Sequence, residues 1–469
     1  MRLPALILAL CCFVWMAAAA EPAAAPRGLS QEVKAKIDKA AAAVLAETGV
    51  PSASIAVVKD GRIAYLQAYG QGRLNPKLAA APGLRYSIGS ISKQFTAAAL
   101  LMLVEEGRLS LDDKVSKYLP DLTRADEISI RQLLSHTAGY QDYWPQDYVM
   151  PRMKSPVTAE QIMDTWAKKP LDYEPGTQWQ YSNTGFVIAG AILQKVSGLG
   201  PFAFLQARVF RPLGMTSVWD SDQQKLMESD AQGYVRYGLG PLRPAPKEGP
   251  GWMFAAGELA MTAEDLARWD VSVLDQSLLK PASYRELETE VRLRNGLGTH
   301  YGLGIGVASQ EGRRTLKHNG EVSGFTAGNT LLPDDGVAVV VLTNQDAVSA
   351  YDTLTNKIVS ALFEVQDPET PKKLEQAKKI FAGLQRGTID RALFTDNCNS
   401  YFDAVACQDI AQSIGPLGLP KTFTQTRKAL RGGMTARRFR VSFPKRTLTV
   451  STYELPDGKM EQYLIAPEE

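Results

Sequence analysis

The stretch Gly89-Ser90-Ile91-Ser92-Lys93-Gln94-Phe95 opens a long apolar segment and decides the fold that the rest of the chain is expected to adopt. Behind it, apolar residues continue to Gly107, a residue suited to the left-handed cap of a helix. The pattern predicts a largely buried helix from Ser92. Ser90 and Lys93 are three positions apart, nearly one helical turn, so both side chains should project from one face.

A serine hydroxyl beside a buried amine is a candidate nucleophile. The hydroxyl attacks poorly until a base removes its proton, and burial lowers the pKa of a lysine so that it can act as that base. Free N–H groups at a helix N-terminus also favour negative charge that develops nearby. The alternative is an ordinary helix start, with Ser90 as its cap.

The Ser-x-x-Lys spacing alone is weak evidence, because it occurs three times in the chain. The copy at positions 277 and 280 runs directly into Pro281, and the copy at 442 and 445 contains Pro444 inside a strand pattern. Neither proline is compatible with a buried helix that starts at the serine. Only Ser90 has the required context.

Two further motifs follow Ser90 along the chain. Tyr181-Ser182-Asn183 comes after Pro175-Gly176, and His318-Asn319-Gly320 lies on a predicted strand. With these motifs, and with the stretches 133–139, 256–269, 301–304 and 318–325, the sequence resembles class C β-lactamases, D-Ala-D-Ala carboxypeptidases and class VIII esterases. These hydrolases share the penicillin-recognising fold. The resemblance covers roughly residues 30–365 and implies a serine hydrolase that acts on an amide, peptide or ester.

The resemblance assigns the catalytic roles residue by residue. Ser90 would attack a carbonyl and form an acyl-enzyme, assisted by Lys93 and by the phenol of Tyr181, which relays protons to the leaving group. Asn183 would hydrogen-bond Lys93 or the substrate amide. A turn with a packed phenol is the alternative for Tyr181.

The third motif is expected to bind substrate. The resemblance implies that backbone N–H groups of Ser90 and Glu321 hold the oxyanion, and that Gly320 leaves room for substrate along the strand edge. His318 departs from the Lys that many β-lactamases have at this position. A neutral imidazole attracts a carboxylate less than an ammonium does, which puts β-lactam hydrolysis in doubt. The alternative for His318 is a strand histidine bonded to a neighbour.

The order of predicted elements indicates an α+β fold. A helix over residues 31–47 precedes a hairpin of 54–58 and 63–69, joined by Asp60-Gly61, and strands return at 315–316, 326–332 and 337–342. A helical subdomain over 112–271 lies between them, so distant pieces complete one sheet. The resemblance implies the β-lactamase/transpeptidase-like fold, an antiparallel sheet flanked by helices, for a domain over residues 28–365.

A second, small α+β domain is predicted over residues 366–469, with no assigned role. Pro368 and Pro371 mark its start, and Thr370-Pro371 suits the cap and first residue of a helix. Segments 435–443, 447–454 and 459–465 predict a three-strand meander.

The charge balance and the N-terminal pattern predict which partners the protein lacks and where it is located. Lys and Arg total 52 against 50 Asp and Glu, so the whole chain has no strong field that would attract nucleic acid. Arg2, the apolar stretch 3–16 and the small residues 18–20 predict a signal peptide over residues 1–20, hence a periplasmic or secreted protein without a stable membrane anchor. A retained anchor is the alternative.

No cofactor or metal is predicted. The three histidines form no zinc motif, and the glycines near 296 and 304 lack the dinucleotide-binding spacing. His136 is interpreted as structural. Cys398 and Cys407 form either a disulfide or two buried thiols. The alternative function is a catalytically slow receptor of the penicillin-binding type, and in both cases the partner is a small-molecule or peptide substrate.

Overall fold

The computed structural model describes residues 28–310, 312–363 and 369–468. The chain divides after Phe363 into two compact units, which we call the catalytic unit and the C-terminal unit. The boundary predicted from the sequence lies two residues later, between positions 365 and 366. The predicted signal peptide lies outside the described residues.

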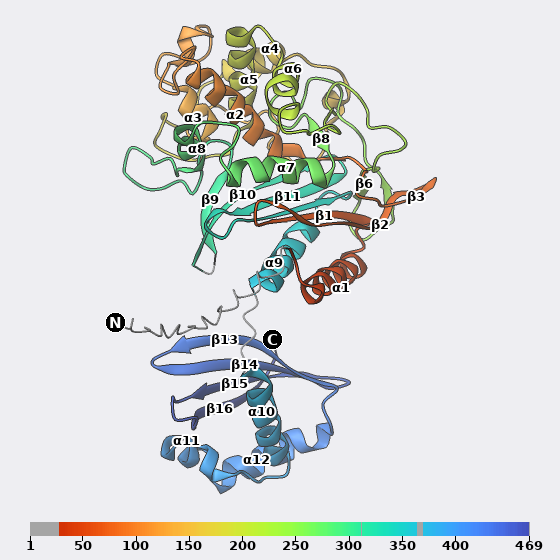
Figure 1. Cartoon of the computed structure of the whole chain (residues 1–469), viewed down its shortest axis with the longest axis vertical. Coiled ribbons are helices and arrows are strands. Elements are labelled where there is room, and N and C mark those ends of the chain that lie inside the picture. The colour runs from red at the N-terminus through yellow and green to blue at the C-terminus, as the bar shows by residue number, and fades with distance from the viewer. Residues whose placement is uncertain (1–27, 311, 364–368, 469) are drawn as a thin grey trace, which may run out of the picture. The chain divides into compact units, whose positions relative to one another are not determined.

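A seven-stranded antiparallel sheet organises the catalytic unit. Its strand order is β3-β2-β1-β12-β11-β10-β9, so strands from both ends of the unit lie side by side. Helices α1 and α9 cover one face, while α7 and the helical region lie on the other (Figure 1). The expected completion of one sheet by distant pieces is therefore observed, and it places β10, which contains the third motif, between β11 and the edge strand β9.

The central strands are buried on both faces, which explains their unbroken apolar sequences. In β12, Val339 and Val341 pack with Ile37 of α1 and Ile358 of α9. Val340, between them, points to the opposite side and joins the larger core around α2. Because successive side chains of a strand point to opposite faces, β12 contributes residues to both hydrophobic cores.

The local signals at the start of the unit act as expected. The side chain of Ser30 caps α1, and Asp60 and Gly61 both adopt positive φ angles in the turn between β1 and β2. Helix α2 begins at Ser92 as predicted, and Gly107 follows its end with φ +69°.

The C-terminal unit has one strand more than predicted. Its sheet has the order β13-β14-β15-β16, and the missed strand β13 is a bulged edge strand whose residues are mostly exposed and polar. Thr370 is the first residue of α10 and Glu369 precedes it as the cap, so the predicted role of Thr370 as cap is wrong. Cys398 and Cys407 are buried free thiols, the second of the two alternatives.

Within the described residues, no single helix is long and apolar enough to cross a membrane. By length and composition alone, α5 passes that test together with the segment Pro201–Phe210, from which it is bent by 64°. Most residues of α5 are buried inside the catalytic unit.

The helices have the following bounds: α1 Gln31–Thr48, α2 Ser92–Glu105, α3 Ile130–Leu134, α4 Ala159–Ile162, α5 Asn183–Ser197, α6 Pro201–Leu205, α7 Ala263–Leu274, α8 Pro281–Glu288, α9 Ala350–Phe363, α10 Thr370–Gln385, α11 Asp396–Tyr401 and α12 Ala404–Ile414. The strands have these bounds: β1 Ser52–Lys59, β2 Arg62–Leu74, β3 Lys77–Ala79, β4 Tyr86–Ser87, β5 Trp219–Asp220, β6 Tyr234–Arg236, β7 Leu242–Pro244, β8 Leu259–Met261, β9 Gly306–Gln310, β10 Arg313–Val322, β11 Phe325–Leu332, β12 Val337–Thr343, β13 Thr422–Arg431, β14 Met434–Ser442, β15 Thr447–Glu454 and β16 Met460–Pro467.

Candidate active site

Ser90 lies on a tight 3-10 turn, Gly89–Ile91, directly before α2. Gly89 has φ +51°, and a Cβ on it would lie 2.8 Å from the backbone nitrogen of Glu321. The turn therefore requires glycine for both conformation and space. It holds the serine at the start of a buried helix, where it lines a cavity of about 450 Å³ and does not cap α2 with its side chain.

Lys93 is fully buried, and its amine contacts three oxygens. Nζ lies 2.9 Å from Ser90 Oγ, 2.8 Å from Asn183 Oδ1 and 2.8 Å from the Ala256 carbonyl oxygen. The amide and carbonyl oxygens only accept, so a neutral amine gives them its two N–H bonds and directs its lone pair at the serine hydroxyl. Burial lowers the pKa of Lys93 to about 7, which makes this neutral form accessible.

Tyr181 completes the group, because its ring lies over the same amine. Lys93 Nζ is 4.9 Å from the ring centroid, and Tyr181 lines the same cavity as Ser90. Burial outweighs the opposing effect of the nearby Ser90 hydroxyl and raises the pKa of Tyr181 well above its usual value. The phenol is therefore neutral near pH 7 and suits proton relay rather than action as a phenolate base.

Buried rings fix the orientation of Tyr181. The imidazole of His136 lies 4.2 Å from the tyrosine ring, and its Nδ1 accepts the backbone N–H of Ser182 at 3.1 Å. Burial lowers the pKa of His136, so this packing surface stays uncharged. The structural interpretation of His136 agrees with these contacts.

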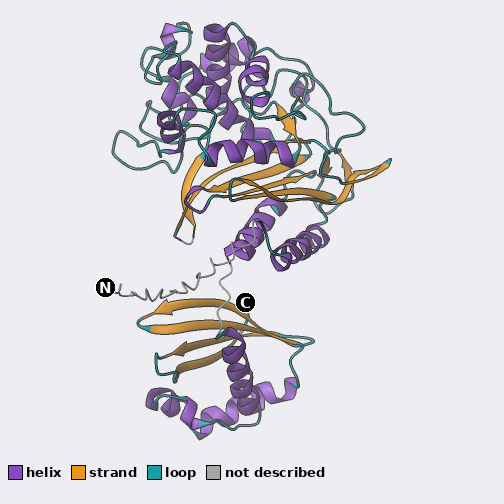
Figure 2. Ribbon diagram, in the orientation of Figure 1, coloured by secondary structure: helices purple, strands orange, loops and turns teal. Residues whose placement is uncertain are grey.

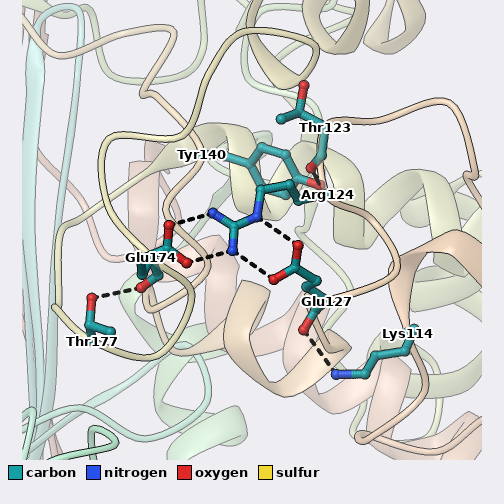
Figure 3. A network of polar contacts seen from close by, with 7 residues as sticks. All are labelled: Lys114, Thr123, Arg124, Glu127, Tyr140, Glu174 and Thr177. Atoms are coloured by element: carbon teal, nitrogen blue, oxygen red, sulfur yellow. Dashed lines mark hydrogen bonds and ion pairs between the residues drawn. The ribbon is translucent and has the colours of Figure 1, made fainter.

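An ion-pair network secures the loop that leads to Tyr181 (Figure 3). Arg124 donates to both carboxylate oxygens of Glu174 and to both of Glu127. Thr177 in turn donates to the Glu174 carbonyl at 2.7 Å. Bidentate pairs of this kind hold geometry better than single surface ion pairs do.

Asn183, the first residue of α5, is oriented by a carboxylate that the sequence did not reveal. Asp142 Oδ1 accepts the Asn183 backbone N–H at 3.1 Å, and Oδ2 lies 3.3 Å from Asn183 Nδ2. Nδ2 is thereby turned toward Asp142 and Oδ1 toward Lys93. Of the two roles predicted for Asn183, the structure shows the contact with Lys93.

Gly320 has a different function from the one predicted. A Cβ there would lie 1.8 Å from the Ile88 carbonyl and 3.2 Å from the Ser90 nitrogen, and Gly320 does not line the cavity. Its missing side chain makes room for the nucleophile turn, so the prediction that it leaves room for substrate is wrong. The same close approach brings the next residue, Glu321, against Gly89, so the backbone nitrogens of Ser90 and Glu321 lie on adjoining segments.

His318 lines the cavity as a neutral ring. Its Nδ1 lies 2.5 Å from the Asn319 carbonyl, which only accepts, so Nδ1 holds the proton and Nε2 accepts from the Tyr301 hydroxyl at 2.7 Å. Burial, aided by Lys93, lowers the pKa of His318 to about 3. This arrangement matches the alternative, a histidine bonded to its neighbours, and offers no cation to a substrate carboxylate.

The remaining cavity wall is acidic. Asp142, Asp147, Glu321 and Asp346 line it, and neither Lys nor Arg is among its described lining residues. Asp346 is only 8% exposed; its Oδ2 accepts the Gly324 N–H at 3.0 Å, while its Oδ1 has no hydrogen-bond partner among the described residues. Asp346 therefore adds a largely buried carboxylate to the cavity wall, and one of its two oxygens has no hydrogen-bond partner among the described residues.

The sequence missed Asp142, Tyr301 and Asp346. Tyr301 lies in a stretch that carried the resemblance but had no assigned role, whereas the two aspartates come from loops without a local pattern. In the described parts of the chain, no three His, Cys, Asp or Glu side chains are grouped as a metal site.

A family model described as Beta-lactamase matches residues 37–361. The chain belongs to this family. It is 26% identical to penicillin-binding protein 4* of Bacillus subtilis (strain 168), over 76% of this chain and 80% of that protein. The D-aminopeptidase of Gluconobacter oxydans (strain 621H) is 27% identical, over 77% of this chain and 68% of that protein.

Solved structures agree with this assignment. A D-stereospecific amidohydrolase from Streptomyces sp. is 28% identical with a TM-score of 0.61, over 70% of this chain and 98% of that chain. The fold predicted for the catalytic unit is confirmed. Together with the family, it identifies the chain as a serine hydrolase.

Proposed function

We propose that the protein is exported and hydrolyses amide or peptide bonds through an acyl-enzyme on Ser90, with preference for substrates that carry an amino group near the scissile carbonyl. The observation that carries the mechanism is the amine of Lys93, fully buried and 2.9 Å from Ser90 Oγ. The N-terminal pattern of residues 1–20 supports export.

The first step forms a tetrahedral intermediate. Ser90 Oγ bonds to the carbonyl carbon while its proton passes to Lys93 Nζ, whose other two partners accept its remaining N–H bonds. The carbonyl oxygen becomes an oxyanion beside the backbone N–H groups of Ser90 and Glu321, which adjoin in the structure. Because these two N–H groups are already in place before the reaction, they lower the barrier to acylation without a rearrangement of the site.

The second step breaks the C–N bond. The leaving amine needs a proton, and the neutral Tyr181 phenol passes one from Lys93 to the leaving nitrogen. A water molecule then attacks the ester on Ser90, gives its proton back through the same groups and releases the acid. Lys93 and Ser90 return to their starting protonation states.

The acidic cavity supports the substrate preference. A protonated amine is attracted to the carboxylates of Asp147, Glu321 and Asp346, which line the cavity. A substrate carboxylate meets the neutral His318 and no lining cation. The D-aminopeptidase and D-stereospecific amidohydrolase among the relatives support D-amino-acid amides and peptides over β-lactams.

The mechanism is tested by mass spectrometry and turnover. Intact-mass analysis after mixing the protein with an activated acyl ester should show one adduct that Ser90→Ala lacks. Steady-state release from D-amino-acid amides should exceed one equivalent. An adduct that persists in Ser90→Ala moves the nucleophile elsewhere, and release that stops at one equivalent indicates the slow receptor instead.

The substrate preference is tested with a matched pair of substrates. We expect the intact protein to cleave a D-amino-acid p-nitroanilide faster than its N-acetyl analogue, because acetylation removes the positive charge. In Asp346→Asn, the ratio of the two kcat/KM values should fall about tenfold, since the attraction between the ammonium group and one cavity carboxylate is lost. A ratio that stays constant would show that Asp346 does not recognise the amine.

A further inference from the structure

Positively charged residues are concentrated in one segment of the C-terminal unit. From residue 410 to residue 453 there are nine Lys or Arg residues and no Asp or Glu. This segment contains β13, β14 and most of β15. The balanced charge of the whole chain therefore conceals one cationic segment within the C-terminal unit.

Within the C-terminal unit, one face of this sheet has no helix packed on it, and we call it the open face. Helices α10, α11 and α12 lie along the other face (Figure 2). Phe439 and Val441 of β14 point into the core on that side, so the alternating residues Arg438 and Arg440 point to the open face, where both are exposed. Register places Arg427 of β13 directly opposite Arg438.

The pairing of Arg427 with Arg438 is unfavourable in the isolated protein. Like charges directly opposite each other on neighbouring strands destabilise a sheet. No ion pair joins either guanidinium to a carboxylate of the described residues, whereas Arg440 lies 2.8 Å from Glu468. A bound anion between the two guanidinium groups would remove this repulsion.

We propose that this open face binds an anionic polysaccharide. Two cross-strand rows define the surface: Arg427, Arg438, Ser451 and Leu464 in one, and Thr424, Arg440, Thr449 and Ala466 in the other. Guanidinium forks match carboxylate and sulfate groups, and the hydroxyls beside them match sugar hydroxyls.

Two other polyanions fit the same rows less well. Leu464 is the one large apolar residue in them, and a bilayer would need more apolar side chains to insert. Neither row contains an aromatic residue on which nucleic-acid bases could stack, and Tyr453 of the adjoining row is already occupied by Arg431, which donates to its hydroxyl and lies over its ring.

The experiment measures binding of the full-length protein to immobilised heparin and, in solution, to polygalacturonate. We expect both to bind, with an affinity that falls as salt rises. In the triple variant Arg427→Gln, Arg438→Gln, Arg440→Gln the affinity should fall more than about tenfold, because three charged contacts are lost. The control variant Lys372→Gln, Lys379→Gln, Arg386→Gln makes the same change in net charge on exposed positions of the helical layer.

The thermal midpoint of each variant shows whether it folds. Relief of the Arg427–Arg438 repulsion should keep the midpoint of the triple variant at or above that of the parent protein. A loss of affinity confined to the triple variant supports the proposal. Equal losses in both variants, a triple variant that binds both glycans as the parent does, or tighter binding to anionic lipid vesicles or duplex DNA than to either glycan would overturn it.

Discussion

At the scale of single residues, the site depends on one amine whose surroundings are all fixed. Lys93 is satisfied as a neutral base because Asn183 and Ala256 offer only acceptors to it. The sequence predicted the pairing of Ser90 with Lys93, since their spacing on a helix requires it. It could not predict Asp142 or Asp346, because loops bring these two carboxylates to the cavity and no periodic pattern marks them.

The protonation state of Lys93 predicts the acidic limb of the pH profile. Its pKa of about 7 lies below the ordinary value, so the active neutral amine forms as pH rises, and kcat/KM should increase through about pH 7 to a plateau. Stopped-assay rates with one D-amino-acid amide between pH 5 and 9 would measure this.

The carboxylate of Asp142 opposes the effect of burial by favouring the charged amine. In Asp142→Asn the pKa of Lys93 should fall further, so the acidic limb of the kcat/KM profile should move to lower pH. The matched variant Asp126→Asn removes an exposed carboxylate outside the cavity and should leave the limb in place. A limb that stays unchanged in Asp142→Asn would assign the titration to a group other than Lys93.

At the scale of elements, the sequence patterns correctly predicted buried strands and tight turns. They failed where an element is exposed, and where a residue distant in the sequence determines the local structure. The apolar strand β12 and the Asp60-Gly61 turn have strong local signals. Strand β13 has none, because it is an exposed edge strand interrupted by a bulge. Gly320 shows the second kind of failure, since only the fold brings the Ile88 carbonyl to it.

The contact between α7 and β11 contains a buried acid whose protonation affects stability. Asp270 is 0% exposed; its Oδ1 accepts from Asn329 Nδ2 at 2.8 Å, while Asp270 Oδ2 and Asn329 Oδ1 have no partner among the described residues. A proton on Oδ2 can satisfy both atoms as a donor to Asn329. Burial accordingly raises the pKa of Asp270 to about 8.

This raised pKa predicts that stability falls with increasing pH. The folded-state pKa of about 8 exceeds the ordinary value of 3.8, so the contribution is complete below about pH 4 and is lost as pH rises to about 8, by a few kcal/mol at most. In Asp270→Asn the thermal midpoint should fall less between pH 5 and 8, and at pH 8 it should equal or exceed that of the parent. An equal deficit of the variant at both pH values would contradict a protonated Asp270.

At the scale of the whole molecule, the chemistry lies in the catalytic unit. Every residue that lines the cavity precedes Phe363 in the chain. The C-terminal unit has a core of its own, in which Phe381 of α10 packs with Phe439 and Val450 of the sheet. Each unit therefore has what it needs to fold alone.

Separate expression of the catalytic unit tests this division of labour. Residues 28–363 should cleave a D-amino-acid amide with a kcat/KM close to that of the full chain, because Ser90, Lys93, Tyr181 and the cavity carboxylates are all present. The fragment should no longer bind heparin, since the arginines of β13 and β14 are removed. Circular dichroism would establish that it is folded. A folded fragment without turnover would show that residues beyond 363 complete the site, which the separate cores give no reason to expect.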